Sequence, residues 1–421
     1  MSLIVHSIVL AATVLALAYL GLLFHGAYRR QARLGQLHEE ERAVLKARLE
    51  RIATHLPEAA MQKAAWSGFR KFRVDGKVLE ADSVCSFYLA PHDGRPLPAF
   101  LPGQYLTFKF AIPGQPREVT RCYSLSDGPG HPDYYRVTIK RIPPPPGKPG
   151  VPPGISSSHF HDRIQVGDIL DVKAPSGNFH IDVEHRGPVV LVGGGVGVTP
   201  VLSMLNYIAS APGGREAWFF YGVRNSREHI LKDYLRELAS QHQNIHLVVC
   251  YSDPLPEDRE GGDYQHAERV GVALFKKVLQ VNNFDFYICG PPPMMESLTR
   301  DLGEWGVPEG RIHFETFGPA SVRKVAEVTH AAQTLAGGGF EIAFARSNKT
   351  VLWTGAGSLL EFAEANGIRI DSGCRAGSCG TCATALREGQ VDYLRKPDAE
   401  IEKGSCLVCI SVPKTPLSLD A

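Results

Sequence analysis

The sequence has almost no excess of charge of either sign, because 45 Lys and Arg stand against 44 Asp and Glu. This balance excludes the broad basic field of a nucleic-acid-binding domain, so we expect no nucleic-acid partner. The chain also lacks the composition of a disordered or collagen-like protein, since 44% of its residues are hydrophobic and 21% are charged. Its 421 residues suggest about three domains.

Cysteine is scarce over most of the chain. Five of the nine cysteines lie from residue 374 onward. A disulfide-stabilised secreted protein distributes its cysteines throughout a short chain, and this sequence does not. The local cluster therefore indicates a metal centre.

No charged residue occurs between residues 3 and 24. A helix over this run would be about 33 Å long, enough to cross a bilayer core. Arg29, Arg30 and Arg33 follow it, whereas no Lys or Arg precedes it. This asymmetry argues against a cleaved signal peptide and places the following domains in the cytoplasm. We expect residues 1–28 to be a single-pass anchor in the cytoplasmic (inner) membrane.

Residues 29–64 are predicted to form a juxtamembrane helix, because Leu45, Leu49, Ile52 and Leu56 lie on one helical face. Two interpretations remain open for this apolar stripe. It either packs against its own catalytic domain or forms a dimerising stalk.

The rest of the chain divides into three predicted modules. Short alternating segments predict an antiparallel β-barrel over residues 65–185. Buried strands alternate with helices over residues 186–319, which predicts an α/β domain with a parallel, doubly wound sheet. Residues 320–339 are small and polar, as in a linker, and residues 340–421 form a compact α+β unit with the cysteine cluster.

Two motifs in the predicted barrel suit a phosphate-bearing ring cofactor. The segment Arg121-Cys-Tyr-Ser124 offers a guanidinium for a phosphate, a flat ring and a hydroxyl. The segment Gly154-Ile-Ser-Ser-Ser158 precedes a helix predicted over residues 159–164, where free N–H groups can receive a pyrophosphate. We interpret His159 and His161 as capping or surface residues rather than metal ligands.

Two further motifs lie at strand ends of the α/β domain. The glycine-rich segment 193–197 joins a buried strand to a helix, where the backbone can approach a diphosphate closely. Residues 287–295 read Tyr-Ile-Cys-Gly-Pro-Pro-Pro-Met-Met and follow a later strand. Because ligands bind at the carboxyl ends of such strands, Cys289 and Gly290 should face the same crevice. A small buried hydrophobe is the alternative role for Cys289.

The cysteine cluster has C-x4-C-x2-C spacing at Cys374, Cys379 and Cys382, the plant-type [2Fe–2S] pattern. Zinc sites instead favour paired C-x2-C hooks, and this segment has one. Spacing leaves Cys406 and Cys409 both open as the fourth ligand. Residues 407–413 resemble the closing strand of plant-type ferredoxins, which favours Cys409 and implies an α+β β-grasp fold.

The motifs at 121–124, 154–157, 193–200, 289–295 and 315–319 occur in the order expected of the ferredoxin–NADP reductase superfamily. Residues 102–319 especially resemble the reductase module of flavohaemoglobins. The expected fold is thus multidomain: a transmembrane helix, an antiparallel β-barrel binding FAD, a parallel-sheet NAD(P)-binding domain and a β-grasp ferredoxin-like domain.

The resemblance implies a role for each matching residue. Arg121 and Ser157 would hold flavin phosphates, Tyr123 would pack on the isoalloxazine and Ser124 would lie near its N5. The predicted catalytic residues are Ser124, Cys289 near the hydride path, Glu315 beside the flavin and Phe317 over its face. Gly197 and Thr199 would bind the nicotinamide nucleotide. Further cofactor contacts are expected at Thr138, Gly154, Ser156, Gly195, Arg224, Gly290, Pro291 and Met295.

The module order resembles that of oxygenase reductases, exemplified by phthalate dioxygenase reductase. It implies electron transfer from NAD(P)H through FAD and a [2Fe–2S] cluster to an oxygenase or another membrane-associated redox protein. FAD is preferred over FMN because of the flavohaemoglobin-like segments. NADH is favoured because the strand ending at Tyr251-Ser-Asp253 supplies a carboxylate, which suits a ribose hydroxyl and repels a 2′-phosphate.

Two other functions stay open from the sequence. An ion-translocating quinone reductase subunit also combines an anchor, a flavin barrel and a plant-type cluster, but there the cluster domain follows the anchor directly. A redox-sensing membrane scaffold would use the cluster without turnover. Intact flavin and nicotinamide motifs argue against the scaffold.

Overall fold

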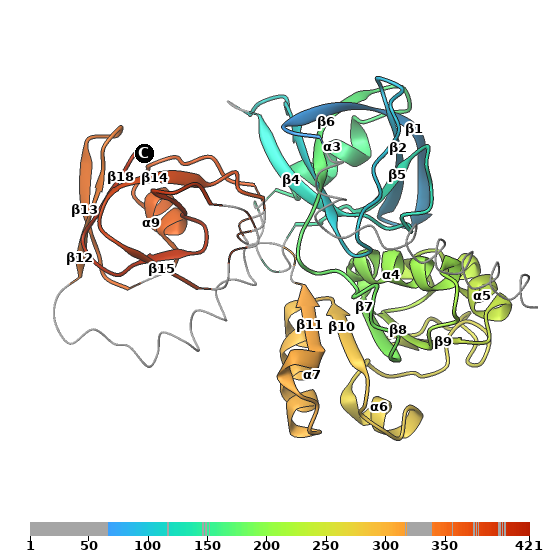
Figure 1. Ribbon diagram of the computed structural model, residues 1–421. Coiled ribbons are helices and arrows are strands. Elements are labelled where there is room, and N and C mark those ends of the chain that lie inside the picture. The colour runs from blue at the N-terminus through green and yellow to red at the C-terminus, as the bar shows by residue number, and fades with distance from the viewer. Residues whose placement is uncertain are drawn as a thin grey trace, which may run out of the picture. The chain divides into compact units, whose positions relative to one another are not determined.

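The structure is a computed structural model (Figure 1). It describes residues 66–115, 118–144, 147, 150, 152–315, 317, 339–355, 357–373, 375, 377, 379–394, 397, 399 and 401–421. The predicted anchor and juxtamembrane helix, Cys374 and nearly all of the predicted linker lie outside these residues. Within the described residues, no helix combines the length and apolar character needed to cross a membrane.

The first module is an antiparallel sheet of six strands in the order β4-β3-β6-β1-β2-β5. The strands are β1 (Phe69–Ala81), β2 (Val84–Pro91), β3 (Tyr105–Phe110), β4 (Val119–Ser124), β5 (Tyr135–Lys140) and β6 (Ile169–Ser176). A bridge between Leu125 and Val137 joins the two outer strands, β4 and β5. Phe72 and Val74 are fully buried on β1 while Arg73 and Asp75 are exposed, the alternation of a strand with one face on a core. The antiparallel flavin-domain fold is confirmed.

Helix α3 (Ile155–Asp162) covers this core through Phe160, which is fully buried. The helix starts four residues earlier than predicted, so the serines of the 154–158 motif lie in its first turn rather than before it. The Ser157 hydroxyl donates to the Gly154 carbonyl (3.0 Å) and accepts from the Ile142 N–H (3.1 Å). These bonds close the turn, which explains how a polar run begins a helix.

The second module is a parallel sheet in the order β11-β10-β7-β8-β9. The strands are β7 (Val189–Gly194), β8 (Ala217–Val223), β9 (Ile245–Tyr251), β10 (Asp285–Cys289) and β11 (Ile312–Glu315). The helices are α4 (Val198–Ser210), α5 (Lys232–Gln241), α6 (Val272–Val278) and α7 (Pro292–Glu304), with 3-10 turns η1 (Gly195–Gly197), η2 (Ser226–Glu228) and η3 (Glu309–Arg311).

Both faces of the parallel sheet are covered by helices. On β7, Val189 and Leu191 belong to the core that also contains α4, whereas Val190 and Val192 belong to the core that contains α6 and α7. A strand buried on both faces reads as a continuous apolar run, which is why the sequence pattern identified it. The parallel-sheet nucleotide-domain fold is confirmed.

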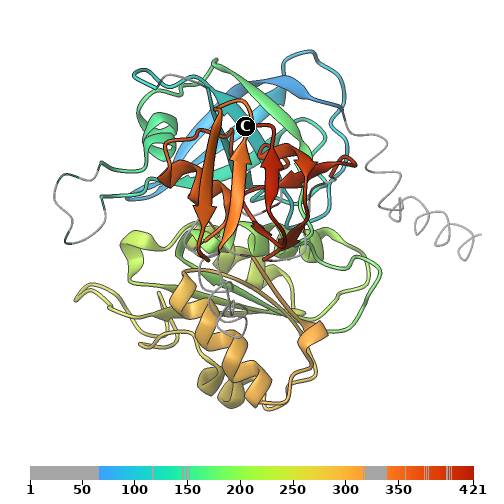
Figure 2. The same ribbon diagram turned by 90° about the vertical axis from the view of Figure 1, so that its left-hand side faces the viewer.

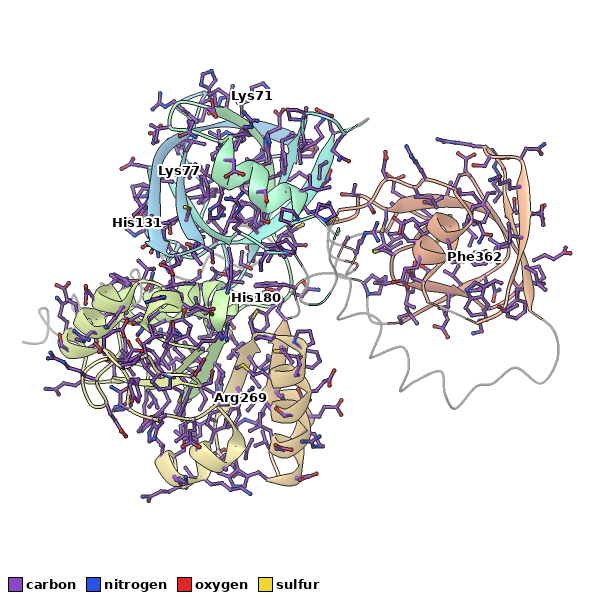
Figure 3. The ribbon with its side chains drawn as sticks, turned by 180° about the vertical axis from the view of Figure 1, so that it is seen from behind. Lys71, Lys77, His131, His180, Arg269 and Phe362 are labelled. Carbon is purple, nitrogen blue, oxygen red and sulfur yellow. The ribbon has the colours of Figure 1, made fainter. Side chains whose placement is uncertain are left out.

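The third module is a mixed sheet in the order β13-β12-β18-β14-β16, with a separate β15–β17 pair. Its orange and red strands face the viewer in Figure 2. The strands are β12 (Phe340–Phe344), β13 (Lys349–Trp353), β14 (Ala383–Glu388), β15 (Val391–Tyr393), β16 (Ser405–Leu407), β17 (Ser411–Pro413) and β18 (Leu417–Leu419). Helix α9 (Leu359–Ala365) begins at a capping box made by Ser358 and Glu361. The ring centroid of Phe362, which lies on this helix and is labelled in Figure 3, is 6.3 Å from that of Phe344.

Candidate functional site

Strand β4 presents the predicted flavin residues. Arg121 and Tyr123 lie on one side of the strand and Ser124 on the other, because side chains alternate. The Tyr123 ring packs edge-on against Phe108 (5.7 Å) and Phe160 (5.1 Å). Burial raises the pKa of its phenol, so Tyr123 is neutral at physiological pH. Ser124 is 5% exposed, so little of this residue is open to solvent.

The start of α3 is suited to a phosphate. Its first helical hydrogen bond runs from the Ser158 N–H to the Gly154 carbonyl (2.9 Å), so the preceding N–H groups of the first turn have no partner within the helix. The buried Ser156 and Ser158 hydroxyl oxygens have no hydrogen-bond partner among the described residues. An anion accepting from these groups would satisfy them, so the residues fit the pyrophosphate of FAD.

The hydroxyls of this region divide into two groups. Ser157 was predicted to bind phosphate, but its hydroxyl closes the turn. Ser158 was not predicted to bind phosphate, yet its buried hydroxyl oxygen is one of the two that an anion could satisfy. Thr138, another predicted contact, lies 2.8 Å from both the Ser86 and Ser126 hydroxyls inside the first module. Its hydroxyl is engaged there, and its contact with a cofactor stays a prediction. His161 Nε2 donates to the Ile139 carbonyl (2.8 Å), which agrees with a structural role.

The glycine-rich loop packs against the end of β10. A Cβ added to Gly197 would lie 2.4 Å from the Cys289 carbonyl oxygen, so only glycine allows this approach. Gly195 instead faces open space, where a nucleotide can approach. The Thr199 hydroxyl donates to the Val196 carbonyl (3.1 Å) and closes the turn into α4. The structure thus brings the two predicted nucleotide motifs together, although Gly197 contacts protein rather than open space.

The corner of the sheet beside this loop holds two further predicted residues. Cys289 and Glu315 are direct neighbours on the parallel strands β10 and β11. Cys289 is fully buried, and burial, with the nearby Glu315 carboxylate, raises the pKa of its thiol. The thiol is therefore neutral and is not a nucleophile. Phe317 follows Glu315 closely and is 41% exposed, so its ring has a free face.

The residues after Cys289 differ from one another in accessibility. Pro291 precedes α7 as its N-cap, and a Cβ on Gly194 would lie 2.8 Å from the Pro291 ring. Met295 is 4% exposed and packs in the core under α6 and α7, away from the role predicted for it. Met294 is the neighbour that reaches the glycine loop, since its sulfur would lie 2.6 Å from a Cβ on Gly194. Because Met294 and Met295 are adjacent and identical, the sequence does not show which of them faces the loop.

At the far end of the sheet, the Arg224 guanidinium lies 3.9 Å from the Asp253 carboxylate. Both side chains are exposed, at 67% and 73% of their maximum areas. Asp253 is the residue predicted to repel a 2′-phosphate, and Arg224 is one of the further predicted cofactor contacts. An exposed pair of this kind contributes little to stability, so both groups are available to a ligand.

The predicted cluster ligands lie in the third module. The sulfur atoms of Cys382 and Cys409 are 3.0 Å apart and both residues are buried. Cys406 lies on β16 opposite Thr384, and burial raises the pKa of its thiol to about 11. This geometry favours Cys409 over Cys406 as the fourth ligand. Cys379 is partly buried, and Cys374 lies outside the described residues.

The loop between these cysteines is sharply turned. Gly377 has φ +78°, and a Cβ on it would lie 2.3 Å from the Ile410 side chain. Arg375 has φ +55°, an unusual value for a residue with a side chain. Its guanidinium forms a two-point ion pair with Glu364 of α9, one contact of which is 2.9 Å. The paired thiolate ligands and tight turns are the chemistry that an iron–sulfur cluster needs.

Three known domain families match successive parts of the chain. Residues 76–181 match the oxidoreductase FAD-binding domain, residues 191–300 the oxidoreductase NAD-binding domain and residues 344–414 the 2Fe-2S iron-sulfur cluster binding domain. The chain is an NAD(P)H-dependent oxidoreductase. Its cofactors are FAD, NAD(P)H and a [2Fe–2S] cluster, as the sequence predicted.

Several known proteins are similar to parts of this oxidoreductase. The flavohemoprotein of Halalkalibacterium halodurans is 40% identical over 263 residues, which are 62% of this chain and 63% of that protein. The flavohemoprotein of Rhizobium meliloti is 41% identical over 269 residues, 64% of this chain and 65% of that protein. The oxidoreductase thus spans less than two thirds of the length of these relatives.

Solved structures extend the similarity. The FAD/NAD binding domain of nitric oxide dioxygenase from Vibrio cholerae has a TM-score of 0.53 and 31% identity, covering 60% of this chain and all of that one. Phthalate dioxygenase reductase has a TM-score of 0.51 and 27% identity, covering 86% of this chain and 99% of that one. The oxidoreductase therefore combines ferredoxin–NADP reductase-like FAD and NAD domains with a C-terminal [2Fe–2S] domain, as in phthalate dioxygenase reductase.

Proposed function

We propose that this oxidoreductase is the membrane-anchored reductase component of an electron-transfer system. It passes electrons from NADH through FAD and the [2Fe–2S] cluster to a protein acceptor, an oxygenase or another membrane-associated redox protein. The observation that carries the proposal is the similarity to phthalate dioxygenase reductase, which covers 99% of that chain. That protein is described as transferring electrons from pyridine nucleotides to a [2Fe–2S] cluster.

The residues of the first two modules bind and orient the reacting rings. The α3 serines and Arg121 would hold the phosphates of FAD, and Tyr123 and Ser124 would fix its ring on β4. The loop at Gly195 and the start of α4 would receive the diphosphate of NADH. Bound together, these cofactors supply the change from two-electron to one-electron transfer. The chain supplies alignment and exclusion of water, since Ser124 and Cys289 are almost fully buried.

The third module would provide the exit for single electrons. Cys374, Cys379, Cys382 and Cys409 would hold the cluster, and the contact between Cys382 and Cys409 supports this set. The fold buries two of these ligands, because Cys382 and Cys409 are 2% and 3% exposed. Gly377 and Gly380 have positive φ values of +78° and +71°, so the loop turns sharply and its N–H groups would be available to the sulfur atoms of a cluster.

Membrane attachment is proposed from the sequence of residues 1–28. The uncharged run of residues 3–24 is followed by Arg29, Arg30 and Arg33, which supports a single-pass anchor with the catalytic modules in the cytoplasm. An anchor would confine the cluster to a thin layer beside the bilayer, which raises its effective concentration toward a membrane partner. Expression with and without residues 1–28, followed by membrane fractionation, tests this part.

NADH-driven reduction of an artificial one-electron protein acceptor tests the function. Turnover by the full chain, with loss of acceptor reduction but retained flavin reduction in Cys409→Ser, is the expected result. A chain that binds its cofactors without turnover would instead be a redox-sensing scaffold. Reduction of a quinone analogue in preference to any protein acceptor would support the quinone reductase alternative.

A further inference from the structure

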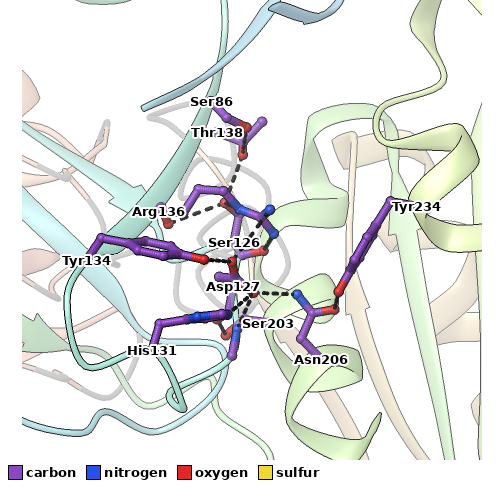
Figure 4. Close-up of polar contacts among 11 residues, drawn as sticks. Ser86, Ser126, Asp127, His131, Tyr134, Arg136, Thr138, Ser203, Asn206 and Tyr234 are labelled. Carbon is purple, nitrogen blue, oxygen red and sulfur yellow. Dashed lines mark hydrogen bonds and ion pairs between the residues drawn. The ribbon is translucent and has the colours of Figure 1, made fainter. Parts of the chain in front are cut away.

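A buried polar network joins the flavin module to the nucleotide module (Figure 4). Its centre is Asp127, three residues after Ser124, and Asp127 is 8% exposed. Asn206 Nδ2 donates to its carboxylate (2.8 Å), and the Ser203 hydroxyl donates to its main-chain carbonyl (2.7 Å). Ser203 and Asn206 both lie on α4. Two hydrogen bonds therefore connect the loop after the flavin strand to the helix after the glycine loop.

The flavin module holds the Asp127 carboxylate in place from its own side. Arg136 Nη1 lies 3.5 Å from the carboxylate, and Arg136 Nη2 donates to the Ser126 carbonyl (2.5 Å). Burial opposes the charge of Arg136, but the Asp127 carboxylate and the Tyr88 and Tyr234 phenols together outweigh this effect, so the pKa of Arg136 is raised. The Gly128 N–H (2.9 Å) and the Tyr134 hydroxyl (3.3 Å) also donate to the carboxylate. Its orientation is thus fixed within the first module.

The nucleotide module fixes the other half of the contact. The Tyr234 hydroxyl on α5 donates to Asn206 Oδ1 (2.8 Å), so the Asn206 Nδ2 group must face Asp127. Ser203 is fully buried and Asn206 is 7% exposed. Asp127 and Asn206 therefore each have a partner in their own module and one across the boundary. Ser203 bonds across the boundary and lies on α4. Such a network has a single low-energy arrangement, unlike an apolar contact that can slide.

We propose that Asp127, Ser203 and Asn206 are positioning residues for hydride transfer. The network lies between Ser124, at the end of the flavin strand, and Thr199, one helical turn before Ser203. It therefore sets how the nucleotide loop is aligned with the flavin strand. Hydride transfer, in which the nicotinamide loses a hydride and the flavin gains it, requires reacting atoms about 3–3.5 Å apart. This inference rests on the proposed function and adds to it the residues that maintain this distance.

The test uses the full chain with FAD bound and compares variants of α4. Asn206→Ala removes the bond to Asp127 but leaves the Asp127–Arg136 pair intact within the first module. Ser203→Ala is the milder second variant, and the double variant removes both bonds. Ser210→Ala is the matched control, because Ser210 is exposed on the same helix and bonds only the Tyr207 carbonyl among the contacts described (3.1 Å).

The first readout is anaerobic flavin reduction at saturating NADH, measured by stopped flow. A small misalignment has a large effect on rate, so we expect the double variant to be at least about tenfold slower, with NAD⁺ affinity within about twofold of wild type. The second readout does not depend on activity. Backbone amides of residues 126–128 and of α4 should exchange with deuterium faster in the variants than in Ser210→Ala.

Two results would overturn the positioning role. One is a variant with faster exchange or a lower melting temperature but an unchanged rate of flavin reduction, since the network would then act on stability alone. The other is a parallel loss of NAD⁺ affinity and rate, which would place the effect in nucleotide binding. If wild-type protein with bound FAD is not reduced by NADH, the proposed function itself fails, and this outcome is distinct from both.

Discussion

The molecule contains two glycine-rich loops that use glycine for different physical reasons. In the nucleotide loop, Gly197 has an ordinary φ of −63°, but a Cβ would lie 2.4 Å from the Cys289 carbonyl oxygen. In the cluster loop, Gly377 has both a positive φ of +78° and a close neighbour in Ile410. Gly197 is thus needed only for the close approach of two strand ends, whereas Gly377 is needed for a turn of the chain as well.

The difference matters for the ligands that the two loops would hold. A dinucleotide lies along the outside of its loop, so the loop must be firmly seated on the sheet beneath it. A cluster lies inside its loop, so the backbone must wrap around it and direct N–H groups inward. Substitutions should therefore damage the two loops in different ways.

The largest effect is expected at the fourth cluster ligand. Cys409→Ser should abolish the cluster, because the sulfur of Cys409 lies 3.0 Å from that of Cys382. Cys406→Ser should retain most of the iron, since Cys406 lies on β16 and is not in that contact. Iron and acid-labile sulfide per chain measure both outcomes. The ligand assignment is wrong if the sulfide survives in Cys409→Ser and disappears in Cys406→Ser.

The next largest effect concerns the nucleotide loop, where one glycine is required by close approach and another by backbone conformation. Gly197→Ala should lower the free energy of unfolding by about 3 kcal/mol, because the new methyl overlaps main-chain atoms that cannot move away. Gly195→Ala should cost only about 1 kcal/mol, since Gly195 has φ +54° but open space around it. Chemical unfolding of both variants compares them. Equal losses would show that backbone conformation, rather than close approach, dominates this loop.

Much of this organisation could be predicted from the sequence. Strand β9 ends at Tyr251 as predicted, because a run of β-branched and aromatic residues followed by a turn has few alternatives. The two nucleotide motifs were expected to meet, since parallel strands end at the same edge of a sheet. The contact between the Gly197 position and Cys289 agrees with that reasoning.

Other features could not be predicted from the sequence, for physical reasons. The start of α3 was placed too late, because three consecutive serines favour both a loop and a helix N-terminus. Met294 and Met295 could not be distinguished, since their chemistry is the same and only helix geometry decides which reaches the loop. The contacts of Asp127 with Ser203 and Asn206 join residues 76 and 79 positions apart, and no local pattern specifies them.

A smaller effect is expected from the ion pair that holds the cluster loop. An arginine in the cluster loop can either attract an acidic docking surface or tune the potential of the cluster. The pairing of Arg375 with Glu364 cancels much of its charge at a distance, so the structure favours the second role. Glu364→Gln should destabilise the third module by about 1 kcal/mol or less, because both side chains are about one third exposed.

The same variant separates docking from tuning. Glu364→Gln leaves the Arg375 charge uncompensated, so a docking role requires faster electron transfer to an acidic protein acceptor and a steeper dependence on salt. We expect instead a shifted cluster potential, with the salt dependence unchanged. Potentiometry and acceptor reduction between low and high ionic strength measure the two quantities. Glu341→Gln, which removes one exposed negative charge from β12 of the same module, is the matched control.

The smallest effect is expected at the adenosine end of the nucleotide sheet, where Arg224 and Asp253 lie 3.9 Å apart. NADH should be preferred over NADPH, because the Asp253 carboxylate repels a 2′-phosphate and can accept a hydrogen bond from a ribose hydroxyl. Asp253→Asn removes the repulsion and leaves Arg224 available to the phosphate. The ratio of kcat/KM for NADPH to that for NADH should rise about fivefold, which corresponds to about 1 kcal/mol. Arg224→Gln should lower the same ratio. Arg227→Gln is the control for the loss of one positive charge, because Arg227 lies beside Glu257 in the next turn.

A ratio that stays constant in both Asp253→Asn and Arg224→Gln would place nucleotide selection elsewhere. A wild-type preference for NADPH would contradict the assignment of Asp253 directly.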